Sequence, residues 1–375
     1  MTKEETRLED LRKTNPLFGP RKLKLGTFCT NVSGAATIST MEGVFEATWD
    51  NVRLTSRLAD EMQFEAIVPL ARWRGFGGDT DFNGAQFEAL TFAAAVSAQT
   101  RYPSVFSTVQ VPSIHPVLAA KQATTIDHVG GGRFTLNVVT GWSRRDVELF
   151  GAPLLEHDKR FVVADEWITL MKLLWTSDEP LDFEGRYFRV KDALQRPRPI
   201  QPYPALMNAS SSSTGKRFAA KHFDVVFIPL RGRDPRSIKD QVESYRQFAR
   251  EEYGRELKIW INSYMIAGDT QEDADRQFDY CVHEKGDWVA ANNMIGELGI
   301  TNPVSPAILK QMTIDFVAGW GGFKLVGTVN KIVSDLKMLV DAGIDGTLLT
   351  WPAFIDGMLR FQKEVHPLLI EEGLR

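Results

Sequence analysis

The chain has 375 residues, of which 43% are hydrophobic, 10% aromatic and 25% charged, and this composition excludes a disordered or collagen-like polypeptide. Its 44 basic and 48 acidic residues give a formal net charge of -4, which provides no strong field to attract nucleic acid or an anionic membrane. The sequence therefore indicates a globular protein that acts on small molecules.

The two cysteines, Cys29 and Cys281, lie far apart, without CxxC or Cys/His spacing. Neither a disulfide framework nor a metal site is predicted from them. The charged first residues lack the apolar core of a signal peptide, and no run of roughly 18 apolar residues occurs. We therefore expect a cytoplasmic protein without a membrane span.

Short β-branched or apolar runs alternate along the chain with longer segments of helical periodicity. The runs predicted to be strands are 23–30, 64–71, 104–112, 134–141, 205–210, 224–230, 257–268 and 346–351. Between them, apolar residues at i, i+3 and i+4 predict helices, among them 87–99, 157–175 and 330–343. This alternation predicts a parallel sheet. Eight strands too apolar to have a wet face favour closure into a (β/α)₈ TIM barrel over an open doubly wound sheet.

The domain organisation predicted is an N-terminal arm, 1–20, followed by one barrel domain, 21–375. Two stretches exceed the minimal strand-helix unit. One is 176–204, after the fourth strand, where LDFEGRYFRV is typical of a hairpin, and the other is 286–326, around the seventh and eighth strands. Both are interpreted as insertions, which in barrel enzymes usually cover or shape a pocket.

Two short hydrogen-bonding side chains, Thr108 and Asn137, stand toward the ends of the third and fourth predicted strands. Barrel enzymes carry their catalytic groups at such positions. The alternative is that Thr108 is an ordinary strand residue and Asn137 a buried amide with satisfied hydrogen bonds.

Two loops after predicted strands are further candidates. RWRGFGGDTDF at 72–82 joins arginines, aromatic residues and glycines that can bring backbone close to a flat ligand, although a flexible surface loop has the same composition. NASSSSTGKRFAA at 208–220 offers serine hydroxyls and backbone N–H groups to a phosphate, although serine before a helix is more often only a cap.

The histidines show no HExxH or catalytic-triad spacing. His115, at the exit of the third strand, and His157, at the start of a helix, could line a pocket. A structural role is the commoner one for an isolated histidine.

Several motifs together resemble the luciferase-like flavin monooxygenases over about residues 22–370: GGGRFTLNVVTGW, LLEHDKRF and the helix ending LLW. Within that family RGFGG, AAKQATTIDHVGGGRF, NVVTGW and GTLLTWPAFIDGM look most like the pyrimidine oxygenases. NVSGAATIST looks like the dimethylsulfone and dibenzothiophene-sulfone monooxygenases. The resemblance implies a TIM barrel that binds reduced flavin mononucleotide (FMN).

Matched by motif position, the resemblance implies flavin contacts at Ala71, Arg72, Asn137, Asp146, Arg160, Phe161 and Ser212. The chain departs from the pyrimidine oxygenases at three places. Phe161 stands where they have a tyrosine, Arg72 where they have a lysine, and the pair Ser210-Ser211 where they have glycine and glutamine. An arginine keeps the lysine's charge but not its geometry.

The resemblance also implies chemistry. Thr108 and Asn137 match a threonine and an asparagine implicated in holding dioxygen beside the reduced flavin. The implied enzyme is a two-component monooxygenase, in which a separate NAD(P)H:flavin reductase supplies reduced FMN. It oxygenates a small organic substrate with cleavage of a C–N or C–S bond, through a flavin–oxygen adduct, and assembles as a homodimer or homotetramer. Since the flavin carries the oxygen chemistry, no strong acid–base residue is required.

Two alternatives remain open at this point. One is hydride transfer with a deazaflavin, which needs no dioxygen; the other is a non-catalytic flavin-binding protein. The substrate is open among pyrimidines, sulfones and other heterocycles, because pocket shape depends on the insertions.

Overall fold

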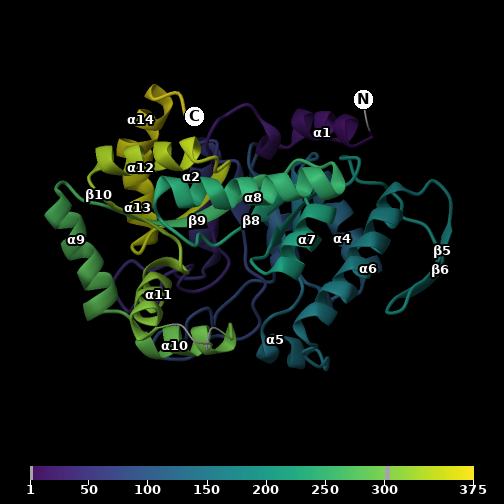
Figure 1. The fold of residues 1–375 in the computed structure, drawn as a ribbon, viewed down its shortest axis with the longest axis horizontal. Coiled ribbons are helices and arrows are strands. Elements are labelled where there is room, and N and C mark those ends of the chain that lie inside the picture. Colours follow the sequence, from purple (N-terminus) through teal and green to yellow (C-terminus); the bar gives the residue numbers. More distant parts are fainter. Residues whose placement is uncertain (1–2, 300–304) are drawn as a thin grey trace.

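The computed structural model describes residues 3–299 and 305–375, and its centre is a closed barrel of parallel strands (Figure 1). The strands pair in the order β1-β2-β3-β4-β7-β8-β9-β11, and β11 pairs back with β1. Their bounds are β1 (Lys24–Phe28), β2 (Ala66–Val68), β3 (Ser104–Gln110), β4 (Phe134–Val139), β7 (Ala205–Ala209), β8 (Val225–Phe227), β9 (Lys258–Ala267) and β11 (Gly346–Thr350). The eight strands predicted from sequence are these eight, and the TIM barrel is confirmed.

Helices surround the barrel, and the three predicted by periodicity are α3, α6 and α12. The α-helices are α1 (Lys3–Thr14), α2 (Trp49–Glu61), α3 (Ala89–Ser97), α4 (Pro116–Val129), α5 (Arg144–Leu149), α6 (His157–Thr176), α7 (Ser213–His222), α8 (Pro235–Tyr253), α9 (Gln271–Asp279), α10 (Trp288–Glu297), α11 (Pro306–Gly319), α12 (Val329–Asp341), α13 (Phe354–Arg360) and α14 (His366–Glu371). Shorter helical turns are η1 (Pro16–Phe18), η2 (Val111–Ser113), η3 (Tyr280–Glu284) and η4 (Phe361–Val365).

Local sequence signals fix where these helices begin and end. Helix α8 starts at Pro235 behind Asp234, whose side chain accepts a hydrogen bond from Ser237 N, and its C-cap is Gly254, with φ of 62°. Thr328 caps α12 in the same way through Lys331 N. Such caps satisfy backbone groups that the helix itself leaves unpaired. Each helix therefore returns the chain to the next strand at a defined point.

One strand was not predicted. β10 (Phe323–Gly327) lies in the segment 286–326 that was interpreted as an insertion, and it pairs in parallel with Ser263–Ala267 at the end of β9. Strand β9 is long enough to pair first with β8 and β11 and then with β10. A five-residue strand next to the glycines of GWGG gives little sequence signal of its own.

The first insertion is the predicted hairpin. Strands β5 (Leu181–Glu184) and β6 (Arg189–Ala193) pair antiparallel, which confirms that interpretation of LDFEGRYFRV. The hairpin projects from the side of the barrel beyond α6 (Figure 1). Glu166 of α6 accepts hydrogen bonds from the backbone N–H groups of Tyr187 and Phe188 in the turn.

The segment between β9 and β10 builds a second hydrophobic core with loops from the carboxyl ends of the barrel strands. That core is formed by buried residues including Ile38, Phe76, Phe82, Tyr264, Ile266, Val282, Met294 and Val317. In Figure 1, α10 and α11 lie on the opposite side of the barrel from α1 and both chain ends. Residues 300–304 of the predicted insertion lie outside the described residues.

The other end of the barrel is covered by the start of the chain. Within the predicted arm, whose residues 1–2 lie outside the described part, Arg7 on α1 forms two hydrogen bonds with the Asp224 carboxylate, at 2.7 and 2.8 Å. Asn15 donates from Nδ2 to Thr135 Oγ1 on β4. Along the described ranges 3–299 and 305–375, the helices are too short or too polar to cross a bilayer.

Candidate active site

Thr108 and Asn137 are direct neighbours across strands β3 and β4. They are paired in the strand register, and Asn137 Nδ2 donates to Thr108 Oγ1 at 3.0 Å. Thr108 Oγ1 in turn donates to the carbonyl oxygen of Pro69, which follows β2, at 2.5 Å. The two residues that the sequence singled out are therefore linked across three neighbouring strands.

Asn137 keeps one polar atom without a protein partner. Its side chain is buried, and Oδ1 accepts no hydrogen bond from the described residues. An unsatisfied buried amide oxygen costs about 1–3 kcal/mol, so its presence needs an explanation. A ligand that donates a hydrogen bond at this place would remove that cost.

Arg72, Asp146 and Gln110 form a buried polar network beside this pair. Arg72 Nη2 donates to Ser143 Oγ at 2.7 Å and forms an ion pair with Asp146 Oδ2. Gln110 Nε2 donates to the same carboxylate oxygen at 3.0 Å and to the carbonyl of Ala71 at 3.1 Å. Ala71, Arg72 and Asp146 are thus brought together as one unit, held by the end of β3 and the start of α5.

The loop 72–82 is anchored by three buried side chains, those of Arg72, Phe76 and Phe82, between exposed positions. The Arg72 guanidinium lies over the rings of Phe76 and Trp142, 4.6 and 5.0 Å from their centroids, and the two rings are within 12° of parallel. Arg72 and Phe76 are buried, whereas Trp73 is exposed. Arginine in such a stack keeps its planar orientation, and its Nε has no partner among the described residues.

Arg160 and Ser212 lie at the starts of two neighbouring helices. Arg160 Nη1 donates to Gly141 O at 2.8 Å, and its buried Nε has no partner in the described structure. Burial lowers the pKa of the Arg160 guanidinium. Ser212 caps α7 by accepting a hydrogen bond from Gly215 N at 3.0 Å.

Helices α6 and α7 contact each other at these ends. Thr214 donates to Asp158 at 2.9 Å, and the rings of Phe161 and Phe218 are 5.5 Å apart. Two adjacent helix N-termini and a half-buried guanidinium form a place suited to a phosphate. Phe161 contributes only its ring, because it lacks the hydroxyl of the tyrosine that the pyrimidine oxygenases have at this position.

Both histidines have structural contacts. His115 caps α4, since its Nδ1 accepts from Val117 N at 3.3 Å. His157 pairs with Asp158 at 2.7 Å and is half exposed. These contacts are consistent with the structural role considered for each.

Sequence reasoning missed several residues that complete the site: Gln110, Trp142, Ser143, Glu297 and Trp320. Gln110 could have been found, because it lies two residues after Thr108 and so points to the same face of β3. Glu297 could not: it accepts from Ser143 Oγ across 154 residues of sequence. This contact ties α10 of the second insertion to α5.

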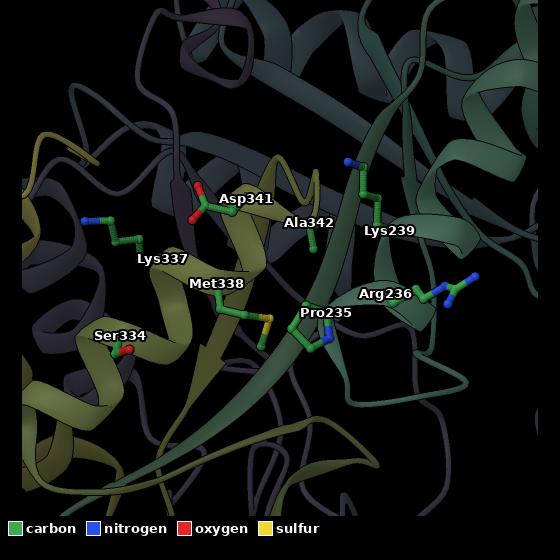
Figure 2. Close-up of a pocket in the computed structure, with 8 residues that line it drawn as sticks. All are labelled: Pro235, Arg236, Lys239, Ser334, Lys337, Met338, Asp341 and Ala342. Carbon is green, nitrogen blue, oxygen red and sulfur yellow. The ribbon is translucent and has the colours of Figure 1, made fainter.

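One cavity reaches the site residues. It has a volume of about 190 Å³, and among its lining residues are Ala71, Arg72, Thr108, Gln110, Leu118 and Phe150. A larger cavity, of about 540 Å³, lies between the outer helices α8 and α12, where Pro235, Arg236, Lys239 and Met338 line it (Figure 2). It shares no lining residue with the candidate site, so its size does not make it the active site.

The barrel, with a buried polar cluster at the carboxyl ends of its strands, places the chain in the class of TIM-barrel enzymes. The sequence profile of the family described as "Luciferase-like monooxygenase" matches residues 23–346. The chain belongs to this family and is a monooxygenase.

Individual relatives agree with this membership. The FMNH(2)-dependent dimethylsulfone monooxygenase of Pseudomonas putida is 31% identical over 92% of each chain. A pyrimidine monooxygenase RutA from Bradyrhizobium sp. (strain BTAi1 / ATCC BAA-1182) is 26% identical over 94% of this chain and 99% of its own. The crystal structure of the long-chain alkane monooxygenase LadA has the same fold, with a TM-score of 0.82 at 22% identity over 95% of this chain and 92% of its own.

Proposed function

We propose that this monooxygenase uses reduced FMN and dioxygen to oxygenate a small organic molecule, with cleavage of a C–N or C–S bond. The observation that carries the proposal is the pair Thr108–Asn137, buried at neighbouring strands with Asn137 Oδ1 left unpaired. The names of the two relatives, both monooxygenases and one FMNH(2)-dependent, support the same cofactor.

The residues present fit FMN. Arg160 and the N-terminus of α7 at Ser212 would hold the phosphate, since Arg160 Nε is a buried donor without a protein partner. Asn137 Oδ1 would accept a hydrogen bond from the ring system, and Ala71 and Arg72 would border it. Charge-assisted bonds of this type are the stronger class of hydrogen bond.

The bound reduced flavin would supply the electrons that activate dioxygen. The chain's own residues orient the polar groups of the site and shield the site from water. Pro69 O fixes the Thr108 hydroxyl, and that hydroxyl in turn holds the Asn137 amide in one orientation. A polar group held in place before reaction stabilises developing charge at little reorganisation cost.

Two further elements keep the site ordered and dry. The bonds of Asp146 to Arg72 and Gln110 lock the loop after β2 against the end of β3. Helix α10 covers that loop, because Asn293 Nδ2 donates to Phe76 O at 2.8 Å. Excluding water strengthens the electrostatic interactions inside the site.

The proposed partners are a separate NAD(P)H:flavin reductase and further copies of the same chain, as a homodimer or homotetramer. A reductase is proposed because the flavin must be supplied in its reduced form, the form that the name of the Pseudomonas putida relative gives for that protein. Contact between reductase and oxygenase need only be transient.

The test is incubation with reduced FMN, ¹⁸O-labelled dioxygen and a panel of pyrimidines, sulfones and N-heterocycles, with products identified by mass spectrometry. We expect one labelled oxygen atom in the product and little peroxide relative to product. A product formed without label under anaerobic conditions with a reduced deazaflavin would instead support the hydride-transfer alternative.

A further inference from the structure

Trp320 occupies an unusual place at the mouth of the barrel. It follows α11 in the sequence Gly319-Trp320-Gly321-Gly322 and has φ of 53° and ψ of 39°, a left-handed conformation that is a genuine outlier for so bulky a residue. Such strain persists only where the surrounding structure enforces it, and it is concentrated at functional sites.

What enforces it is a residue of the barrel itself. Asn262 on β9 donates from Nδ2 to the carbonyl oxygens of Gly319 and Trp320, at 3.1 and 3.2 Å. In the closed strand order β9 is four strands from β3 in either direction, so Asn262 stands across the barrel from Thr108. Trp320 is therefore held on the wall opposite the proposed oxygen site.

The Trp320 indole packs among rings from two other segments. Phe28, at the end of β1, lies edge-on to it with centroids 6.3 Å apart, and Phe82 and Phe76 of the loop after β2 lie at 5.7 and 6.4 Å. Phe227, at the end of β8, is 5.8 Å from Phe28. The wall is thus aromatic, and Trp320 packs against both hydrophobic cores of the molecule.

Two arginines next to this wall are already paired. Arg72 stacks on Phe76 but is bound to Asp146. Arg233 reaches the surroundings of Tyr264 but is bound to Asp315. An anionic ligand would have to compete with these carboxylates, whereas a neutral one needs no counter-ion.

We propose that Trp320 is the specificity-determining residue of the substrate site, and that the substrate is a small neutral molecule that packs against its indole. This assignment rests on the proposed function, which places the oxygen site at Thr108, opposite Trp320. It predicts discrimination against substrates that carry a carboxylate, sulfonate or phosphate.

The experiment measures binding separately from turnover, with calorimetry on the FMN-loaded protein. The probes are uracil and dimethyl sulfone as neutral molecules and methanesulfonate as the anion that matches dimethyl sulfone in size. The variants are Trp320→Ala, Trp320→Phe and, as a matched control in the same insertion, Trp288→Phe. Circular dichroism and thermal unfolding verify that each variant is folded.

We expect at least one neutral probe to bind, and methanesulfonate to bind at least about tenfold more weakly than dimethyl sulfone. Trp320→Ala should weaken the neutral probe about tenfold, Trp320→Phe by less, and Trp288→Phe not at all, since aromatic packing and buried area are lost only in the first. Turnover should follow the same pattern in KM, with kcat changed little.

Three results would overturn the assignment: no binding of either neutral probe, methanesulfonate binding as tightly as dimethyl sulfone, or Trp320→Ala binding like the unaltered protein. Failure of the proposed function looks different. In that case a neutral probe binds and depends on Trp320, yet no oxygenated product forms with reduced FMN in air.

Discussion

At the amino end of the barrel the buried carboxylates Asp224 and Glu65 are each bound by two arginines. Asp224 accepts from Arg7 at 2.7 and 2.8 Å, from Arg255 at 3.0 Å and from Leu206 N at 2.9 Å. Glu65 is bound there by both Arg21 and Arg375, which joins the start of the barrel to the last residue of the chain.

At the carboxyl end several buried polar atoms have no hydrogen-bond partner among the described residues. Asn137 Oδ1, Arg72 Nε and Arg160 Nε are buried without partners among the described residues, and Trp320 keeps a strained backbone. A buried Nε without a partner in the described structure occurs at both ends, since Arg375 has one at the amino end. What differs is that the amino end pairs its buried carboxylates Asp224 and Glu65 with arginines, whereas the carboxyl end leaves the acceptor Asn137 Oδ1 without a partner among the described residues. In TIM barrels the first pattern serves stability and the second serves a ligand site.

The largest effect is expected for the substitution Asp224→Asn. The substitution leaves two buried arginines without their carboxylate, and removing one partner of a buried ion pair costs about 3–5 kcal/mol in the free energy of unfolding. Urea denaturation measures the change, and Glu372→Gln, at an exposed ion pair with Lys337, is the control that should leave the midpoint unchanged. An Asp224→Asn protein as stable as the unaltered one would contradict the assignment of this end to stability.

The converse change at the carboxyl end is Thr108→Val. It removes the hydroxyl that orients Asn137 and should slow product formation by about 100- to 1,000-fold, or about 2.7–4 kcal/mol, while flavin still oxidises and peroxide accumulates. Single-turnover product yield and peroxide measure the effect. Thr108→Ser retains the hydroxyl and is the matched control; if Thr108→Val has the unaltered rate and yield, the hydroxyl is only structural.

A smaller effect is expected where the flavin phosphate is proposed to bind. Arg160→Ala should weaken FMN binding by about 1.5–3 kcal/mol, the usual value for a hydrogen bond to a charged group. It should leave riboflavin, which has no phosphate, nearly unaffected. Calorimetry with both ligands tests this, with the exposed Arg144→Ala as control. Equal affinity of the unaltered protein for FMN and riboflavin would remove Arg160 and Ser212 from the phosphate site.

Features of the fold and the site could be predicted from sequence where they depend on residues in the same or consecutive strands, and not where they depend on residues far apart in the chain. The eight barrel strands are buried on both faces and were predicted as apolar runs, whereas β10 pairs with residues about sixty positions earlier and was missed. The neighbours Thr108 and Asn137 were predictable because consecutive parallel strands bring equivalent ends together.

Trp320 was not predictable in the same way. Its contacts join Phe28, Phe76 and Asn262, which lie far apart in the chain, and no local pattern encodes them. The proposed cofactor residues came from motif matches, and their role as flavin contacts stays a prediction that the structure makes physically reasonable without testing it.

The Asp224 carboxylate should make the stability of the protein depend on pH. Burial alone would raise the pKa of Asp224, but Arg7 and Arg255 outweigh it and hold the pKa at about 2, below the ordinary value of 3.8. Because the folded pKa is the lower one, the stabilisation is present above about pH 4 and is lost as the pH falls toward 2. The difference corresponds to about 2 kcal/mol above pH 5, of which about half should be gone at pH 3.

Comparison with Asp224→Asn isolates this carboxylate from the others that titrate in the same range. Urea denaturation of both proteins at pH 6, 5, 4 and 3 should show the stability gap between them narrowing only below about pH 4. A gap that stays constant to pH 3 would mean that folding does not change the pKa of the Asp224 carboxylate. The ion pairs of Asp224 with Arg7 and Arg255 would then contribute no net electrostatic stabilisation, and the stability of the amino end would have to come from its packing.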